Sequence, residues 1–135
     1  MKQSGIDSFL DKRIWIIGAS SGIGEACAKS LISQNARVIL SSRRIERLNA
    51  IAQDAKVDQA LVIPLDVTND EQLATAYEKI INTWGGIDLL LFVSGIYTPL
   101  RADDFDIHIA EQTIDANLLG PMKAVALVLP KMLQA

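Results

Sequence analysis

The chain has 135 residues, of which 50% are hydrophobic and 21% are charged, so it can bury the core of one domain and is not a disordered chain. Its formal net charge of −3 lacks the basic excess typical of nucleic-acid binding, and its single cysteine excludes an intrachain disulfide. Residues 1–13 lack the apolar core of a signal peptide and no apolar run approaches the length of a membrane span, so we expect a soluble cytoplasmic protein without nucleic-acid or membrane partners.

The first predicted strand, residues 14–17, runs into a glycine-rich turn, and a helical pattern begins at Gly22. Gly18 would let the chain leave the strand in a tight turn, Gly22 would let the backbone approach a pyrophosphate, and Gly24 would let the helix pack closely on the strand. The start of the helix presents free N–H groups and the positive end of its dipole to an anion. This strand–turn–helix context predicts a dinucleotide site. Two hydroxyl groups of the turn lie beside the same anion, those of Ser20 and Ser21.

Strands and helices alternate along the next seventy residues. The strands are nearly continuous apolar runs, which predicts a parallel sheet with helices on both faces. Right-handed crossovers place the four strands in the order 3-2-1-4, as in an α/β, doubly wound sheet of the Rossmann type. In chain order, the predicted elements are a helix at 22–35, a strand at 37–41, a helix at 44–55, a strand at 60–65, a helix that begins at a capping box of Thr68 and Glu71 and ends at Trp84, and a strand at 87–93.

A loop at 97–106 precedes a long apolar helix at 107–133, which Gly120 and Pro121 are expected to kink or split. This helix is apolar almost all the way round, so it must be covered on more than one side, and a four-stranded sheet covers only one. The last strand also leaves an unpaired edge. We therefore expect self-association through the helix, the strand edge, or both. The helix residues expected to be exposed are Leu118, Leu119, Val125, Leu127, Val128 and Leu129.

The tip of the second strand has no acid before Glu46. An acid at this tip would hydrogen-bond the adenosine ribose and repel a 2′-phosphate. Arg43 could instead pair with a 2′-phosphate through its planar guanidinium, and Ser42 is a compatible donor. Alternatively, Arg43 and Arg44 begin a solvated helix.

The motif Gly18-Ala-Ser-Ser-Gly-Ile-Gly24 resembles the cofactor motif of the classical short-chain dehydrogenases/reductases, and the resemblance extends through most of the chain. It implies an NAD(P)-dependent oxidoreductase that transfers hydride between nicotinamide and a carbonyl or alcohol substrate, and often a homo-oligomer. The residues that the resemblance and the pattern assign to the cofactor are Gly18, Ser20, Ser21, Gly22, Ile23, Gly24, Ser42, Arg43, Asp66, Val67 and Gly95.

Individual positions refine this resemblance. NAD-preferring members carry Asp at the position of Ser42, and NADP-preferring members often carry Arg at the position of Arg43, so NADP is favoured over NAD. Asp66 and Val67 resemble the Asp-Val pair whose acid contacts the adenine amino group; alternatively, Asp66 only favours a helix N-terminus. The family's Asn-Asn-Ala-Gly stretch after the fourth strand corresponds to residues 92–95, where only Gly95 is retained.

One catalytic candidate and one absence follow from the resemblance, and the residues themselves argue against a metal site. Asn117 resembles the asparagine that holds a water in the family's proton relay; alternatively, it braces the backbone before Gly120. Neither Tyr77 nor Tyr97 is followed four residues later by lysine, so the chain alone is expected to be inactive. With His108 as the only histidine, we expect no metal site.

The resemblance covers about the first half of a typical family member. We therefore interpret residues 1–135 as a single NAD(P)-binding Rossmann domain, incomplete at its C-terminal end and truncated before the family's later strands. The alternative is a non-catalytic module that binds a dinucleotide or a protein partner.

Overall fold

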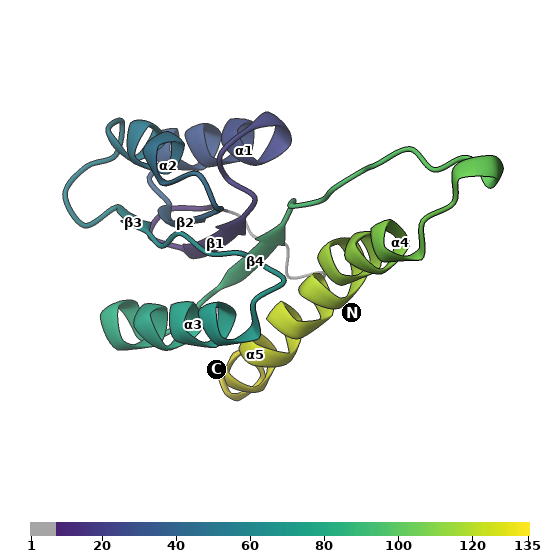
Figure 1. Ribbon diagram of the computed structural model, residues 1–135. Coiled ribbons are helices and arrows are strands. Elements are labelled where there is room, and N and C mark those ends of the chain that lie inside the picture. The colour runs from purple at the N-terminus through teal and green to yellow at the C-terminus, as the bar shows by residue number, and fades with distance from the viewer. Residues whose placement is uncertain (1–7) are drawn as a thin grey trace, which may run out of the picture.

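The computed structural model describes residues 8–135, and its core is a parallel sheet with the strand order β3-β2-β1-β4 (Figure 1). This order confirms the expected topology. The sheet is held in register by pairs such as Ile17 with Ser41 and Ile17 with Phe92. The strands are β1 (Arg13–Ile17), β2 (Arg37–Ser41), β3 (Ala60–Val62) and β4 (Leu89–Phe92).

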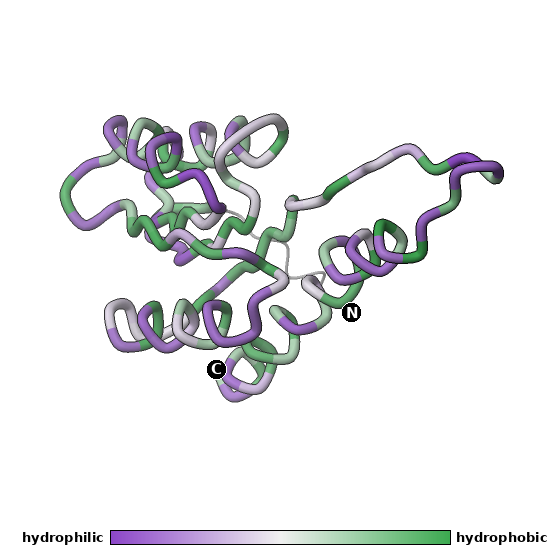
Figure 2. Tube along the Cα trace, viewed as in Figure 1, coloured by the Kyte–Doolittle hydropathy of each residue, from purple (hydrophilic) through white to green (hydrophobic). Residues whose placement is uncertain are grey.

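Helices cover both faces of the sheet (Figure 1). Helices α1 (Gly22–Ser33) and α2 (Ile45–Ala52) lie on one face, and α3 (Asp70–Trp84) and α5 (Gly120–Gln134) lie on the other. Successive strand residues point to opposite faces, and both faces of β1 are buried, so its sequence is continuously apolar. Figure 2 shows the same apolar character along the central strands. Ile14 and Ile16 pack under α1 and α2, whereas Trp15 and Ile17 pack against α3 and α5.

Two strands are shorter than the sequence predicted. β3 covers only Ala60–Val62 of the predicted 60–65, although the N–H groups of Ile63 and Leu65 continue the pairing with β2 by donating to the carbonyls of Leu40 and Ser42 at 3.0 Å each. β4 covers only Leu89–Phe92 of the predicted 87–93. These differences move no predicted residue away from the carboxyl edge of the sheet.

The capping box predicted at the start of α3 is wrong. Asn69 is the N-cap, and its side chain accepts a hydrogen bond of 3.0 Å from the backbone N–H of Gln72. Thr68 lies one residue before the N-cap, and its hydroxyl donates to the carboxylate of Asp66 at 2.7 Å. The Gln72 side chain then accepts from the backbone N–H of Asp66 at 2.8 Å, which fixes the loop between β3 and α3.

The long helix is continuous from Ile107 to Gln134 and contains a π-helical turn. It consists of α4 (Ile107–Ile114), the π turn η2 (Asp115–Leu119) and α5, and it follows the short 3-10 helix η1 (Ala102–Asp104). The expected kink or split at Gly120 and Pro121 is therefore replaced by a π turn just before them. Pro121 has no N–H, and the π turn adjusts the hydrogen-bond pattern before it, with the Gly120 N–H donating to the Asp115 carbonyl.

By length and composition alone, this helix could cross a membrane, contrary to our expectation that no apolar run approaches that length. The core helix of an α/β domain passes the same test. Here α5 packs against α3 and β4 and buries Ala124 and Val128. Val128 is only 3% exposed, and Leu127 packs partly buried on the same core, so these two residues do not belong to the exposed set expected from the sequence.

An ion pair joins the amino-terminal ends of β1 and β4. The Asp88 carboxylate accepts hydrogen bonds from Nη2 of Arg13 at 2.9 Å and from Nε at 3.0 Å. Nη1 of the same guanidinium donates to the Trp84 carbonyl at 3.0 Å, at the end of α3. A Cβ at Gly86 would lie 2.9 Å from this guanidinium, so the glycine leaves room for it. The side-chain hydrogen bond from Arg13 is the main cause that lowers the pKa of Asp88.

This lowered pKa predicts how stability depends on pH. The pair stabilises the fold fully above the unfolded-state pKa of an aspartate, about 4, and the stabilisation is lost as pH falls through the lower folded-state pKa. Both side chains are about one-third exposed, so we expect a modest effect. Urea unfolding from about pH 6 to about pH 3 should show a smaller loss of stability in Asp88→Asn than in the unchanged chain. The exposed Asp103→Asn is the control, and an equal pH dependence in all three proteins would contradict the assignment.

Candidate functional site

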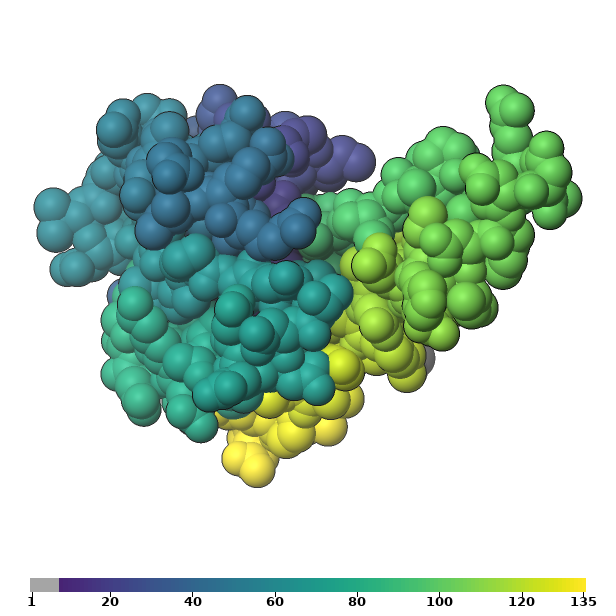
Figure 3. Space-filling view, in the orientation of Figure 1, coloured from purple at the N-terminus to yellow at the C-terminus, as the bar shows by residue number. Residues whose placement is uncertain are grey.

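A cleft of about 910 Å³ lies at the carboxyl ends of the strands. Ile17 from β1, Ser42 after β2, Leu65 after β3 and Val93 after β4 all line it. The chain runs from β1 outward to β3 and then crosses back to β4, so the cleft lies at the point where the strand order reverses. In the space-filling view a notch separates the blue part of the molecule from the green segment after β4 (Figure 3).

The structure confirms the tight turn predicted at Gly18 and the close packing predicted at Gly24, whereas the approach of Gly22 to a pyrophosphate stays a prediction. Gly18 has a φ of +98°, and a Cβ there would lie 2.5 Å from the backbone nitrogen of Ser94. A Cβ at Gly24 would overlap the Gly18 carbonyl, so this glycine permits the close packing of α1 on the turn. Gly22 has a φ of +56°, and no other atom lies within 4 Å of where its Cβ would be. The backbone at Gly22 is therefore open to a ligand.

The N-terminus of α1 has unused donors. Ser21 is the N-cap residue, but its side chain makes no capping hydrogen bond. The N–H groups of the first turn have no partner within the helix, and they suit an anion. Ser20 is 5% exposed and lines the cleft together with Ser21 and Gly18. Gly22, Ile23 and Gly24 do not line it, and the Ile23 side chain is 74% exposed, so Ile23 could contribute only its backbone.

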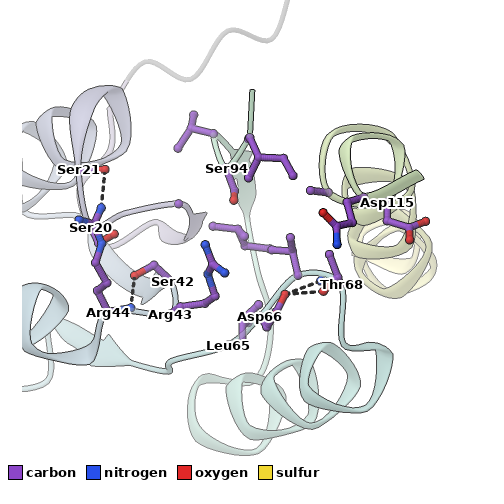
Figure 4. A pocket seen from close by; sticks show the side chains of 18 residues that line it. Ser20, Ser21, Ser42, Arg43, Arg44, Leu65, Asp66, Thr68, Ser94 and Asp115 are labelled. Atoms are coloured by element: carbon purple, nitrogen blue, oxygen red, sulfur yellow. Dashed lines mark hydrogen bonds between the residues drawn. The ribbon is translucent and has the colours of Figure 1, made fainter. Parts of the chain in front are cut away.

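Two arginines stand on the side of the cleft formed by the loop between β2 and α2 (Figure 4). Arg44 reaches across to the glycine turn, where its Nη2 donates to the hydroxyl of Ser21 at 2.9 Å. Its backbone N–H donates to the hydroxyl of Ser42 at 3.2 Å. The sequence predicted that Arg43 and Ser42 belong to the cofactor site. It assigned Arg44 no role there and considered it only as part of a solvated helix start. The repeated arginine was the available signal, because both side chains line the cleft.

Asp66 stands on the opposite side of Arg43 from the glycine turn (Figure 4). Its carboxylate accepts hydrogen bonds from the hydroxyl of Thr68 at 2.7 Å and from the Thr68 backbone N–H at 2.9 Å. These bonds, with the nearby charge of Arg43 as a smaller cause, lower the pKa of Asp66, so it is ionised at neutral pH. Val67 also lines the cleft. The site therefore presents cations and an acceptor carboxylate within one cleft.

Asn117 does not line the cleft. Its side chain accepts from the backbone N–H of Ile96 at 2.8 Å and donates to the Ile96 carbonyl at 2.7 Å. A Cβ at Gly95 would lie 3.4 Å from its amide oxygen, so Gly95 allows the asparagine to approach the backbone. Asn117 thus braces the loop after β4, and the catalytic role implied by the resemblance stays a prediction.

Several lining residues were missed by sequence analysis. Most lie on the long helix or in the loop after β4, and they reach the cleft because the helix packs at Gly120 on the end of β4 and on the loop between β3 and α3. A Cβ at Gly120 would lie 3.5 Å from Val67 and 3.3 Å from Phe92, which shows this close approach. No local motif marks these positions. They are Thr68, Val93, Ser94, Ile96, Gln112, Asp115 and Ala116.

The cleft fits a nicotinamide dinucleotide. It is lined by cationic groups at the tip of β2 and by an ionised acceptor at Asp66, and the open backbone of Gly22 and the free donors at the N-terminus of α1 lie next to the lining residue Ser21. Among residues 8–135, no group of three or more His, Cys, Asp or Glu side chains is placed to hold a metal ion.

Comparison with known proteins identifies the family. A model of the short chain dehydrogenase family matches residues 12–135. The chain therefore belongs to the short-chain dehydrogenase family. It is 33% identical over 123 residues to an uncharacterized oxidoreductase of Staphylococcus haemolyticus, covering 90% of this chain and 53% of that protein. It is 34% identical over 124 residues to an uncharacterized oxidoreductase of Staphylococcus aureus, covering 92% and 54%. The chain spans about half the length of these curated relatives.

Solved structures share the fold. A short-chain dehydrogenase from Streptomyces avermitilis matches with a TM-score of 0.86 and 26% identity, over 91% of this chain and 45% of that one. The L-sorbose reductase of Gluconobacter frateurii, solved with NADPH and L-sorbose, matches with a TM-score of 0.85 and 23% identity, over 93% and 49%. At this identity, the second match shows the fold alone.

Proposed function

We propose that this chain is the NAD(P)-binding half of a reductase or dehydrogenase that acts on a carbonyl or alcohol. The observation that supports this most directly is the glycine turn, where the open backbone of Gly22 and the free N–H groups of α1 adjoin the cleft. In this proposal the turn holds the diphosphate, and Asp66 accepts a hydrogen bond from the adenine amino group. When bound, the nicotinamide supplies hydride chemistry.

In this proposal hydride transfer takes place only in the intact enzyme, of which this chain is the cofactor-binding half. The printed sequence has no tyrosine followed four residues later by lysine, so we assign cofactor binding and not turnover to these 135 residues. The role of Asn117 in this proposal is to hold the backbone at Ile96, which adjoins the cofactor site.

We infer a preference for NADP over NAD. Arg43 and Arg44 both line the cleft at the tip of β2, and the chain has no acidic residue there before Glu46. An arginine fork matches a phosphate group through paired hydrogen bonds, whereas a ribose with a free 2′-hydroxyl gains less from a cation. The carboxylate of Asp66 lies on the far side of Arg43 from the glycine turn, near enough for the charge of Arg43 to contribute to the lowered pKa of Asp66.

The test is the charge reversal Arg43→Asp. Loss of a charge-assisted contact of about 1.5–3 kcal/mol should weaken NADPH binding about ten- to hundredfold, with a much smaller change for NADH. Isothermal titration of both cofactors measures this difference. Arg101→Asp is the matched control because Arg101 is exposed and outside the cleft. Equal weakening of both cofactors would refute the NADP assignment, and absence of binding by the unchanged chain would refute the proposed function.

We also infer that the chain self-associates through the outer face of the long helix. Six of its exposed apolar side chains fall at spacings of four, four, three, four and four residues, which places them on one stripe of the helix, whereas exposed Ile107 and Leu119 lie outside this series. The buried residues Ala124 and Val128 lie on a different face. We define the outer stripe as Ile114, Leu118, Met122, Val125, Leu129 and Leu133.

A further inference from the structure

Ser94 stands where the chain leaves β4 and enters the cleft, and sequence analysis assigned it no role. Figure 4 shows its hydroxyl oxygen pointing into the cleft, and no hydrogen bond joins it to the other residues drawn there. The residue is half-buried. A hydroxyl can both donate and accept, so this side chain brings an unused hydrogen-bonding group to the site.

The backbone of Ser94 is fixed on both sides. On the preceding side, the Val93 N–H donates to the Ile17 carbonyl at 2.9 Å, which is the last bond between β1 and β4. On the following side, Asn117 holds both backbone groups of Ile96. Ser94 itself packs against Gly18 so closely that a Cβ at Gly18 would lie 2.8 Å from its Cα. The hydroxyl is therefore carried by a rigid backbone, and binding through it orders little else.

The position of Ser94 indicates which part of a dinucleotide it meets. The arginines that suit a 2′-phosphate follow β2, on one side of β1, whereas Ser94 follows β4 on the other side. A dinucleotide that crosses the end of β1 would place its adenosine near β2 and β3 and its remaining part near β4. The groups beyond the adenosine that can pair with a hydroxyl are the diphosphate oxygens and the second ribose.

We propose that Ser94 is a further cofactor-binding residue, whose hydroxyl hydrogen-bonds the nicotinamide-side phosphate or the nicotinamide-side ribose of the dinucleotide. This inference rests on the proposed function. The family's usual stretch has alanine at this position, so the hydroxyl is a feature of this chain.

Ser94→Ala tests this assignment, because it removes only the hydroxyl and keeps the Cβ. Binding is measured by isothermal titration with NADPH and with adenosine 2′,5′-bisphosphate. The bisphosphate keeps the 2′-phosphate and the adenosine-side 5′-phosphate but lacks the nicotinamide-side phosphate and ribose. We expect NADPH to bind about three- to tenfold more weakly to the variant, as for one neutral hydrogen bond, and the bisphosphate to bind within about twofold of the unchanged chain. The melting temperature should not change, since the hydroxyl bonds no residue lining the cleft.

Ser41→Ala is the matched comparison. The hydroxyl of Ser41 is buried and accepts from Nε1 of Trp15 at 2.9 Å, so its loss should lower the melting temperature with little effect on NADPH. If Ser94→Ala binds NADPH like the unchanged chain, or loses both ligands equally, the assignment of Ser94 is overturned while the proposed function stands. If the unchanged chain binds no NADPH, the proposed function fails and this inference fails with it.

Discussion

Gly18→Ala should destabilise the chain by about 2–6 kcal/mol and abolish dinucleotide binding. The φ of +98° strains any residue with a Cβ, at about 1–3 kcal/mol. In addition, the new Cβ would lie 2.5–2.8 Å from backbone atoms of Val93 and Ser94, and overpacking of this kind costs about another 1–3 kcal/mol. Because the obstructing atoms are backbone, β4 must shift away from β1. A loss of this size is a large part of the roughly 5–15 kcal/mol that holds a typical domain folded.

Gly22→Ala is the control that separates backbone strain from crowding. Its φ of +56° is also left-handed, but the position of its Cβ is open, so we expect only about 1–2 kcal/mol of destabilisation. The folded Gly22→Ala chain should still lose affinity for NADPH, because the methyl group would stand where a phosphate approaches. Urea unfolding of the two variants gives the comparison. Equal losses of stability would contradict the close contact between Gly18 and Ser94.

The fold could be predicted because its signals are local and repeated. The run Ile14–Ile17 is apolar at every position, and this pattern requires cover on both faces of the strand. Once the strands are parallel, the handedness of the crossovers leaves one simple order, and the structure has that order. The glycine turn was predictable for the same reason, since Gly18 and Gly24 accommodate nearby backbone and Gly18 and Gly22 adopt a positive φ within one short motif.

The rest of the site depends on contacts that are distant in sequence. Arg44 binds Ser21, and Asn117 binds Ile96, across separations of 23 and 21 residues. The hydrophobic periodicity of the sequence does not predict such pairs. The incorrect prediction of a capping box has a similar cause. Thr68 and Asn69 can both cap a helix, and the sequence does not show which of the two does so. In the structure Asp66 takes its hydroxyl, and Asn69 caps α3 instead.

The outer stripe leads to the second large expected effect, on assembly. Its six members are between 44% and 76% exposed, and all of them are apolar. Apolar surface contributes about 25 cal/mol per Å² when it is buried, so a few hundred Å² favour association by several kcal/mol before entropic costs. A second copy of the same helix presents a matching stripe, as two-fold symmetry requires. We therefore expect the chain to form dimers at micromolar concentration.

Val125→Glu should convert these dimers to monomers. The substitution places a carboxylate in the middle of the stripe, and burying an unpaired charge there is far more costly than the loss of one valine contact. Val125 is 46% exposed in the chain, so the fold itself should tolerate the change. Gln134→Glu adds the same charge on the other side of the helix and should leave the dimer intact. Light scattering after size-exclusion chromatography, over a concentration series, measures the oligomeric state of both variants. A monodisperse monomer of the unchanged chain at high micromolar concentration would show that the stripe does not drive association.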